Sequence, residues 1–69
     1  MYKTILKSIA NCNMDNKAYL NFSRIINISY DLKMITKEQK NFLQIIADGL
    51  HDNWSFKEFF IRGLPYFIR

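Results

Sequence analysis

Apolar side chains in this chain recur every three or four residues, which is the pattern of amphipathic helices rather than of strands. The first apolar stripe consists of Tyr2, Ile5, Leu6, Ile9 and Ala10. Polar residues fill the positions between them, so one face of the segment is apolar and the other is polar. This stripe predicts a first helix from about Tyr2 to Asn11.

A second, longer helix is predicted to begin after Asp15 and to run to about Lys33. A carboxylate at the position of Asp15 accepts hydrogen bonds from the free N–H groups of the first helical turn. The main face of this segment consists of Ala18, Phe22, Ile25, Ile26 and Ser29. Leu20 and Ile28 lie on another side, and a helix that is apolar on two sides is packed on both flanks. The pattern therefore predicts that this helix is the central one.

Two capping boxes predict where two further helices begin. In the first box, Thr36 precedes the helix and Gln39 stands three residues later; in the second, Ser55 and Glu58 have the same spacing. The stripe of the helix after Thr36 consists of Phe42, Leu43, Ile46 and Leu50, with Ile45 beside it. The sequence thus predicts a third helix and a fourth.

Glycine and proline predict where these two helices end. Gly49 is suited to the left-handed conformation that follows a helix, so it is predicted to end the third. Gly63 and Pro65 are predicted to stop the fourth, because proline has no N–H group with which to continue the helical hydrogen bonds. Residues 66–69 then form an apolar C-terminal tail. The expected fold is all-α: one domain over residues 1–69, built as a compact three-to-four-helix bundle with short loops.

The composition is that of a small folded domain with a thin margin of stability. Of the 69 residues, 49% are hydrophobic and 23% are charged. A core of this size rarely supplies more than ~3–5 kcal/mol without a disulfide, a metal or a partner subunit. The single cysteine excludes an internal disulfide. Packing alone remains, or packing combined with self-association.

Several features favour a cytoplasmic protein. The segment after Met1 lacks the apolar core of a secretory signal peptide, and no window approaches the ~18 apolar residues of a membrane span. The net charge is +4, and the basic residues are spread along the chain rather than clustered. Residues with AT-rich codons outnumber those with GC-rich codons by 34 to 9. This bias indicates a low-GC host, and so short a reading frame there favours a phage or another mobile element.

Catalysis has little support in the residue types present. Cys12 and His51 are the only pair that could form a nucleophile and its base. Each has a simpler role, as a buried thiol and as a cation at a helix C-terminus. Glu38 and Glu58 stand in first turns, where acidic residues cap helices. One cysteine and one histidine cannot supply the four ligands of a structural zinc site, and two isolated glycines cannot cradle a phosphate. The sequence predicts no enzyme, no cofactor and no metal site.

The C-terminal third is the most informative segment for function. Its apolar and aromatic residues are Trp54, Phe56, Phe59, Phe60, Ile61, Leu64, Tyr66, Phe67 and Ile68. A short helix hides one stripe, here predicted to be Phe56, Phe59 and Phe60. So small a domain has little surface left to cover the rest, and part of the set is expected to be exposed. Exposed apolar patches mark interaction sites.

A protein-binding role follows from this surplus. The predicted contact set is Trp54, Phe60, Arg62, Tyr66 and Phe67, since aromatic residues and arginine are enriched at interfaces. The predicted partner is a host protein or a second copy of the chain. The predicted function is that of a non-enzymatic modulator or inhibitor of a host protein machine, and a defence system is one candidate for that machine. The alternative for these residues is that the tail folds back and completes the core.

DNA binding is the alternative function. The helix after Thr36, together with the preceding helix and turn, could form a helix-turn-helix motif. Its exposed polar residues would be Lys37, Lys40, Asn41 and Gln44. Asparagine and glutamine read adenine, and lysines hold phosphates. Binding to a membrane surface is less favoured, because the two arginines near the C-terminal aromatic residues form a weak anchor to anionic lipid.

Overall fold

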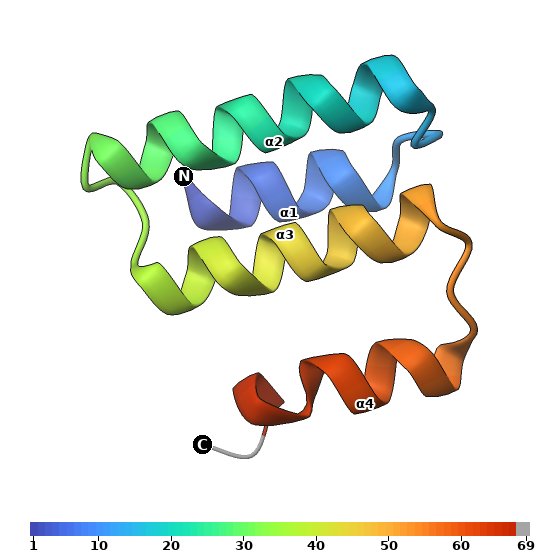
Figure 1. Cartoon of the computed structure of the whole chain (residues 1–69). Helices are drawn as coiled ribbons and strands as arrows, with labels where there is room; N and C mark the ends of the chain where they lie inside the picture. The colour runs from blue at the N-terminus through green and yellow to red at the C-terminus, as the bar shows by residue number, and fades with distance from the viewer. Residues whose placement is uncertain (68–69) are drawn as a thin grey trace.

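The computed structural model describes the backbone of residues 1–67 and the side chains of residues 1–63. The described chain forms four helices and contains no strand: α1 (Tyr2–Ala10), α2 (Asn16–Asp31), α3 (Lys37–His51) and α4 (Phe56–Phe67). Figure 1 shows α2, α3 and α4 in a row, with neighbouring helices antiparallel. The all-α fold and the helical bundle that the sequence predicts are therefore confirmed.

The central helix is α3, and the prediction that α2 occupies this position is wrong. α3 packs against α1, α2 and α4, and Figure 1 shows it between α2 and α4. Leu20 and Ile28, the second apolar side of α2, are exposed rather than covered by a neighbour. The molecule is thin in one direction, with extents of 32 × 31 × 15 Å, because α1 is the one helix that lies outside the row.

The buried core is small. Its apolar members among the described side chains are Ile5, Ile9, Met14, Ile26, Ile35, Leu43 and Ala47. They come from α1, α2, α3 and the segments that join them, and the largest of the fully buried side chains are Ile9, Ile26 and Leu43. The large hydrophobic side chains that stay exposed are Met1, Leu20, Ile25, Ile28, Leu32, Met34, Phe56, Phe60 and Ile61. More large apolar side chains thus face solvent than fill the core.

Helix starts follow the predicted capping chemistry. The Asp15 carboxylate accepts a 2.8 Å hydrogen bond from the Ala18 N–H group. At Thr36 both halves of the capping box form, with distances of 3.1 and 3.0 Å between it and Gln39. Ser55 Oγ accepts a 3.3 Å hydrogen bond from the backbone N–H group three residues later. Each cap satisfies N–H groups that have no partner within their own helix.

Helix ends differ from the prediction. Gly49 lies inside α3, which continues to His51. The left-handed residue after this helix is Asn53, with a φ of 55°, and the Trp54 N–H group donates back to the Gly49 carbonyl at 2.9 Å. This is a Schellman ending, in which asparagine takes the place that glycine usually fills. The end of α2 has the same geometry, with Lys33 at a φ of 60°.

The fourth helix also runs beyond its predicted end. α4 continues through Gly63 and Pro65 to Phe67. Proline removes its own N–H hydrogen bond and clashes with the turn before it, at a cost of ~3 kcal/mol or more, but it does not prevent the residues after it from being helical. Residues 66–67 of the predicted tail therefore belong to α4, whereas residues 68–69 lie outside the described part of the chain.

Candidate protein-binding surface

α4 is fastened to α3 where the two helices approach closely at Gly49. A Cβ atom at this position would lie 2.3 Å from two ring atoms of Phe59 and 2.6 Å from Trp54 Cε3. Only a residue without a side chain leaves room for both rings. Gly49 is therefore needed for packing, and it does not adopt the left-handed conformation for which it was predicted.

Trp54 and Arg62 pack beside the contact between α3 and α4. The Trp54 and Phe59 rings meet edge to face, with centroids 5.5 Å apart and an interplanar angle of 65°. The Arg62 guanidinium lies over the Trp54 ring at 4.5 Å, and its Nε donates a 3.2 Å hydrogen bond to Glu58 Oε2. Cation–π contacts of this kind stabilise by about 0.5–1 kcal/mol at exposed sites. The two residues thus hold α4 in place against α3.

The outward side of α4 is apolar. Phe56 is 87% exposed, and Phe60 and Ile61 are each 54% exposed. Phe56 and Phe60 are four residues apart and share one side of the helix, whereas Phe59 faces α3 and Gly63 is buried. The prediction that Phe56, Phe59 and Phe60 form one hidden stripe is wrong, because only Phe59 faces α3. We call Phe56, Phe60 and Ile61 the α4 apolar surface.

The structure divides the predicted contact set. Phe60 is exposed, as the protein-binding prediction requires. Trp54 is half-buried, and Arg62 is exposed but engaged with Trp54 and Glu58. Tyr66 and Phe67 lie outside the described side chains. Sequence reasoning missed Phe56, which it assigned to the hidden stripe, whereas Ile61 was among the residues expected to lack cover within the short helix, and it is exposed.

The residues of the DNA-binding alternative take different places. Gln44 Nε2 donates to Ser23 Oγ on α2 at 3.2 Å, so this side chain faces the neighbouring helix. The Lys40 ammonium lies 4.6 Å from the centre of the Tyr30 ring, also on α2. Asn41 is half-buried, and Lys37 is exposed. Two of the four predicted residues therefore pack against α2.

The α2–α3 pair also lacks the geometry of a helix-turn-helix motif. The Tyr30–Lys40 contact near the turn and the Tyr19–Asp48 hydrogen bond near the other end show that the two helices lie side by side. In a helix-turn-helix the second helix crosses the first steeply and projects into the groove. This geometry does not favour the DNA-binding alternative, which stays a prediction.

A polar network that sequence reasoning missed joins α2 and α3. The Tyr19 hydroxyl donates to Asp48 Oδ1, which also accepts a 2.9 Å hydrogen bond from Gln44 Nε2. The Tyr19 ring stacks on His51, with centroids 4.4 Å apart and an interplanar angle of 24°. Pairs separated by so many residues in the chain leave no local pattern in the sequence.

His51 is the second centre of this network. Its Nε2 lies 2.6 Å from Asn16 Oδ1, and its Nδ1 lies 3.0 Å from Asp52 Oδ1. The residue stands in the last turn of α3, where a cation is predicted. In addition, its side chain links the end of α3 to the start of α2. The network therefore has a structural explanation and does not require a catalytic one.

The Tyr19 contact predicts a dependence of stability on alkaline pH. The hydrogen bond to Asp48 raises the pKa of Tyr19 above its ordinary value of 10.0, with further contributions from burial and from the charges of Asp48 and Asp52. A raised pKa in the folded state means that the stabilisation is complete below the unfolded value of about 10 and is lost as pH rises through the folded value. Denaturant unfolding of the wild type is thus expected to show falling stability above pH 10.

The control is Tyr19→Phe, which keeps the ring and removes the hydroxyl. Tyr2, whose pKa burial raises, is present in both proteins, so the difference between the two stability curves isolates Tyr19. A difference that stays constant from pH 8 to pH 11.5, a range chosen to span the ordinary tyrosine pKa of about 10, would contradict the prediction.

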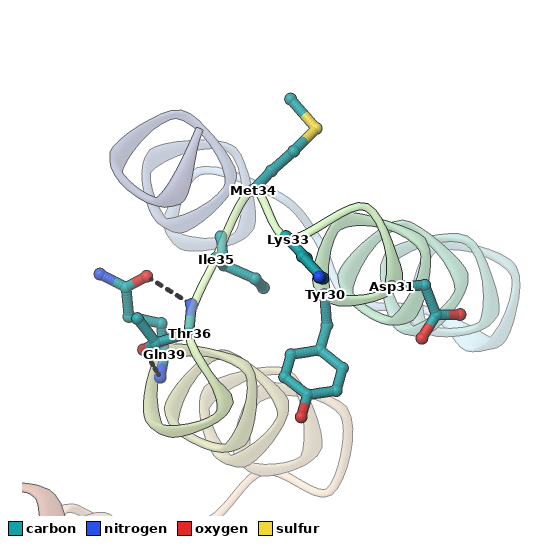
Figure 2. A pocket seen from close by; sticks show the side chains of 7 residues that line it. All are labelled: Tyr30, Asp31, Lys33, Met34, Ile35, Thr36 and Gln39. Atoms are coloured by element: carbon teal, nitrogen blue, oxygen red, sulfur yellow. Dashed lines mark hydrogen bonds between the residues drawn. The ribbon is translucent and has the colours of Figure 1, made fainter.

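A cavity lies at the α2–α3 turn. It has a volume of about 420 Å³ and is lined by Tyr30, Asp31, Lys33, Met34, Ile35, Thr36 and Gln39. Figure 2 shows the Thr36–Gln39 capping bonds at its edge and the Met34 side chain directed away from it. Two of the polar residues that line it, Thr36 and Gln39, are thus already used in capping. Among the described residues no group of three or more histidine, cysteine, aspartate or glutamate side chains could hold a metal ion.

Comparison of the chain with protein-family models, with curated proteins and with solved structures finds no match. None of the described helices has both the length and the apolar character needed to cross a bilayer. Function therefore has to be argued from the surface of the chain itself, and the α4 apolar surface is its most exposed aromatic feature.

Proposed function

We propose that this protein is a non-enzymatic binding protein, which docks on a protein partner through the α4 apolar surface. The observation that carries the proposal is the exposure of Phe56 and Phe60 on one side of α4, together with that of Ile61 further round the helix. Among the described residues, α4 packs mainly against α3. Burying an aromatic side chain of this kind stabilises a complex by about 1.5–3 kcal/mol. Aromatic anchors at the centre of an interface are the typical hot spots.

The charge around the surface supports a partner with an acidic rim. Lys57 is exposed beside Phe56, and the chain as a whole carries a net charge of +4. Complementary charge at the rim speeds association and adds specificity, while the apolar centre supplies most of the affinity.

The finer proposal is a modulator or inhibitor of a host machine, encoded by a phage or another mobile element. Its support is the codon bias toward a low-GC genome. Such a protein would act by occupying a surface that its target needs.

The test compares immobilised wild type with the double variant Phe56→Asp/Phe60→Asp. Leu20→Asp is the matched control, because Leu20 is also exposed but lies on α2. Proteins retained from host lysate are identified by mass spectrometry, and the affinity of each is then measured with purified components. The double variant is expected to lose at least ~30-fold in affinity, which corresponds to one hot spot of about 2 kcal/mol.

The control is expected to retain the same protein with unchanged affinity. Circular dichroism checks that all three proteins remain helical. If the wild type, the double variant and the control retain the same proteins equally, the α4 apolar surface is not the binding site and the proposal fails.

A further inference from the structure

A second exposed apolar line runs along the outside of α2. It consists of Asn21, Ile25, Ile28 and Leu32, and we call it the α2 outer seam. These residues follow one another at intervals of four, three and four, which is the heptad spacing of a coiled-coil contact line. The three apolar side chains are between 44% and 65% exposed. A heptad line of this kind requires a second helix, and no described helix covers it.

The seam lies at an edge of the bundle and is free to receive a partner. Figure 1 shows α2 as the outermost helix of the row. Its buried residues, Ile26 and Ser29, face the other helices, and they do not belong to the seam. Arg24 and Asp31 flank the seam on one side, seven residues apart in the same heptad position. Both are exposed, and neither makes an ion pair within the described part of the chain.

We infer that the α2 outer seam is the interface of a homodimer, in which α2 of one copy packs antiparallel against α2 of the other. A two-fold axis between Ile26 and Asn27 places Ile25 of each copy against Ile28 of the other. The same axis brings Arg24 of each copy close to Asp31 of the other. The two ion pairs are identical by symmetry, as an isologous interface requires.

Charge decides between the two possible orientations. In a parallel pair, the flank that carries Arg24 and Asp31 would face the opposite flank of the other copy, which holds Phe22 and Ser29, so no flanking ion pair would form. In the antiparallel pair, the same flank of both copies meets, and the two Arg24–Asp31 contacts are attractive. The seam itself carries no charge, so no like charges are buried against each other along the contact line.

The small core supplies the second reason for a second copy. Seven apolar side chains are buried among those that the structure describes, and the single cysteine excludes an internal disulfide. Small domains without a disulfide or metal are commonly stabilised by oligomerisation. Covering the seam would add three apolar side chains per copy to the buried set. The inference is independent of the α4 apolar surface, which lies on a different helix.

The experiment measures the association state by sedimentation equilibrium. The wild type is expected to be a dimer, and Ile28→Glu is expected to be a monomer at every concentration tested. Leu20→Glu places the same charge on another exposed side of α2 and is expected to stay dimeric. Circular dichroism on all three proteins confirms that the helices are retained.

Charge reversal tests the register and orientation. Arg24→Asp alone and Asp31→Arg alone are each expected to raise the dimer dissociation constant by about tenfold, since each creates two repulsive pairs. Mixing the two variants is expected to restore dimers, because every flanking pair is then attractive. The double variant in one chain is expected to restore the homodimer as well.

Three results would overturn the inference. If the wild type is monomeric, the proposed dimer does not exist. If the Ile28→Glu variant is still dimeric, the interface does not lie on the α2 outer seam. If the two single reversals dimerise as the wild type does, or if their mixture shows no recovery, the antiparallel register is wrong. Loss of the dimer proposal would leave the partner-binding test of Phe56 and Phe60 unaffected, so the two proposals can fail separately.

Discussion

Replacing Leu43 by alanine is expected to unfold most of the protein at 37 °C. Leu43 is fully buried on α3, the helix that packs against α1, α2 and α4. Removing a buried leucine side chain destabilises a domain by about 2–5 kcal/mol. A core in a domain of this size supplies only ~3–5 kcal/mol, so little or no net stability remains. Thermal unfolding followed by circular dichroism measures the loss.

Ile28→Ala is the matched control, because it shortens an aliphatic side chain on α2 that one copy of the chain leaves exposed. At concentrations where the protein is monomeric, the free energy of unfolding of this variant is expected to stay within about 0.5 kcal/mol of the wild-type value. Equal losses for the two variants would show that α3 is not the centre of the core.

Replacing Gly49 by alanine is expected to destabilise the α3–α4 contact, although alanine is the better helix former. In a solvent-exposed helix this change stabilises by up to about 1 kcal/mol. Here the added Cβ atom would meet Phe59 at 2.3 Å and Trp54 at 2.6 Å. Overpacking in a well-packed contact costs about 1–3 kcal/mol, so the steric effect exceeds the gain in propensity. Urea unfolding gives the sign.

Trp54 fluorescence supplies a local measurement for this variant. The chain has a single tryptophan, which packs beside Gly49 and Phe59. Displacement of the ring is expected to shift its emission toward the wavelength of exposed tryptophan. Asn27→Ala, at an exposed position of α2, serves as the control and is expected to leave the emission unchanged. A Gly49→Ala protein with wild-type emission and higher stability would contradict the packing role.

Helix starts were predictable because their chemistry is local. The side chains of Asp15, Thr36 and Ser55 each accept a hydrogen bond from the backbone N–H group three residues ahead. Both partners of each bond therefore lie within four consecutive residues of the sequence. Helix ends were not predictable in the same way. Gly49 has two possible uses, as a left-handed ending and as a place of close approach, and only the position of Phe59 distinguishes them. That position depends on the tertiary packing.

Hydrophobic periodicity likewise did not reveal which helix is central in the bundle. α2 carries apolar residues on two sides, and this pattern alone does not tell a second core face from an exposed seam. The exposure of Ile25, Ile28 and Leu32 resolves it.

In the candidate surface, the sequence analysis placed Phe60 both in the hidden stripe and in the predicted contact set, and the structure shows it exposed. Phe56 was assigned to the hidden stripe, because a spacing of three to four residues fits two neighbouring sides of a short helix.

Among the described residues α4 packs mainly against α3, which separates the fold from the surface that is proposed to bind a partner. The core lies in α1, α2, α3 and their connections, whereas Phe56, Phe60 and Ile61 lie on a helix that contributes no apolar side chain to it among those described. Substitutions on the outward side of α4 consequently have little effect on the fold. Under the proposed function, selection from a changing target would let this helix diverge quickly while the three-helix scaffold stays constant.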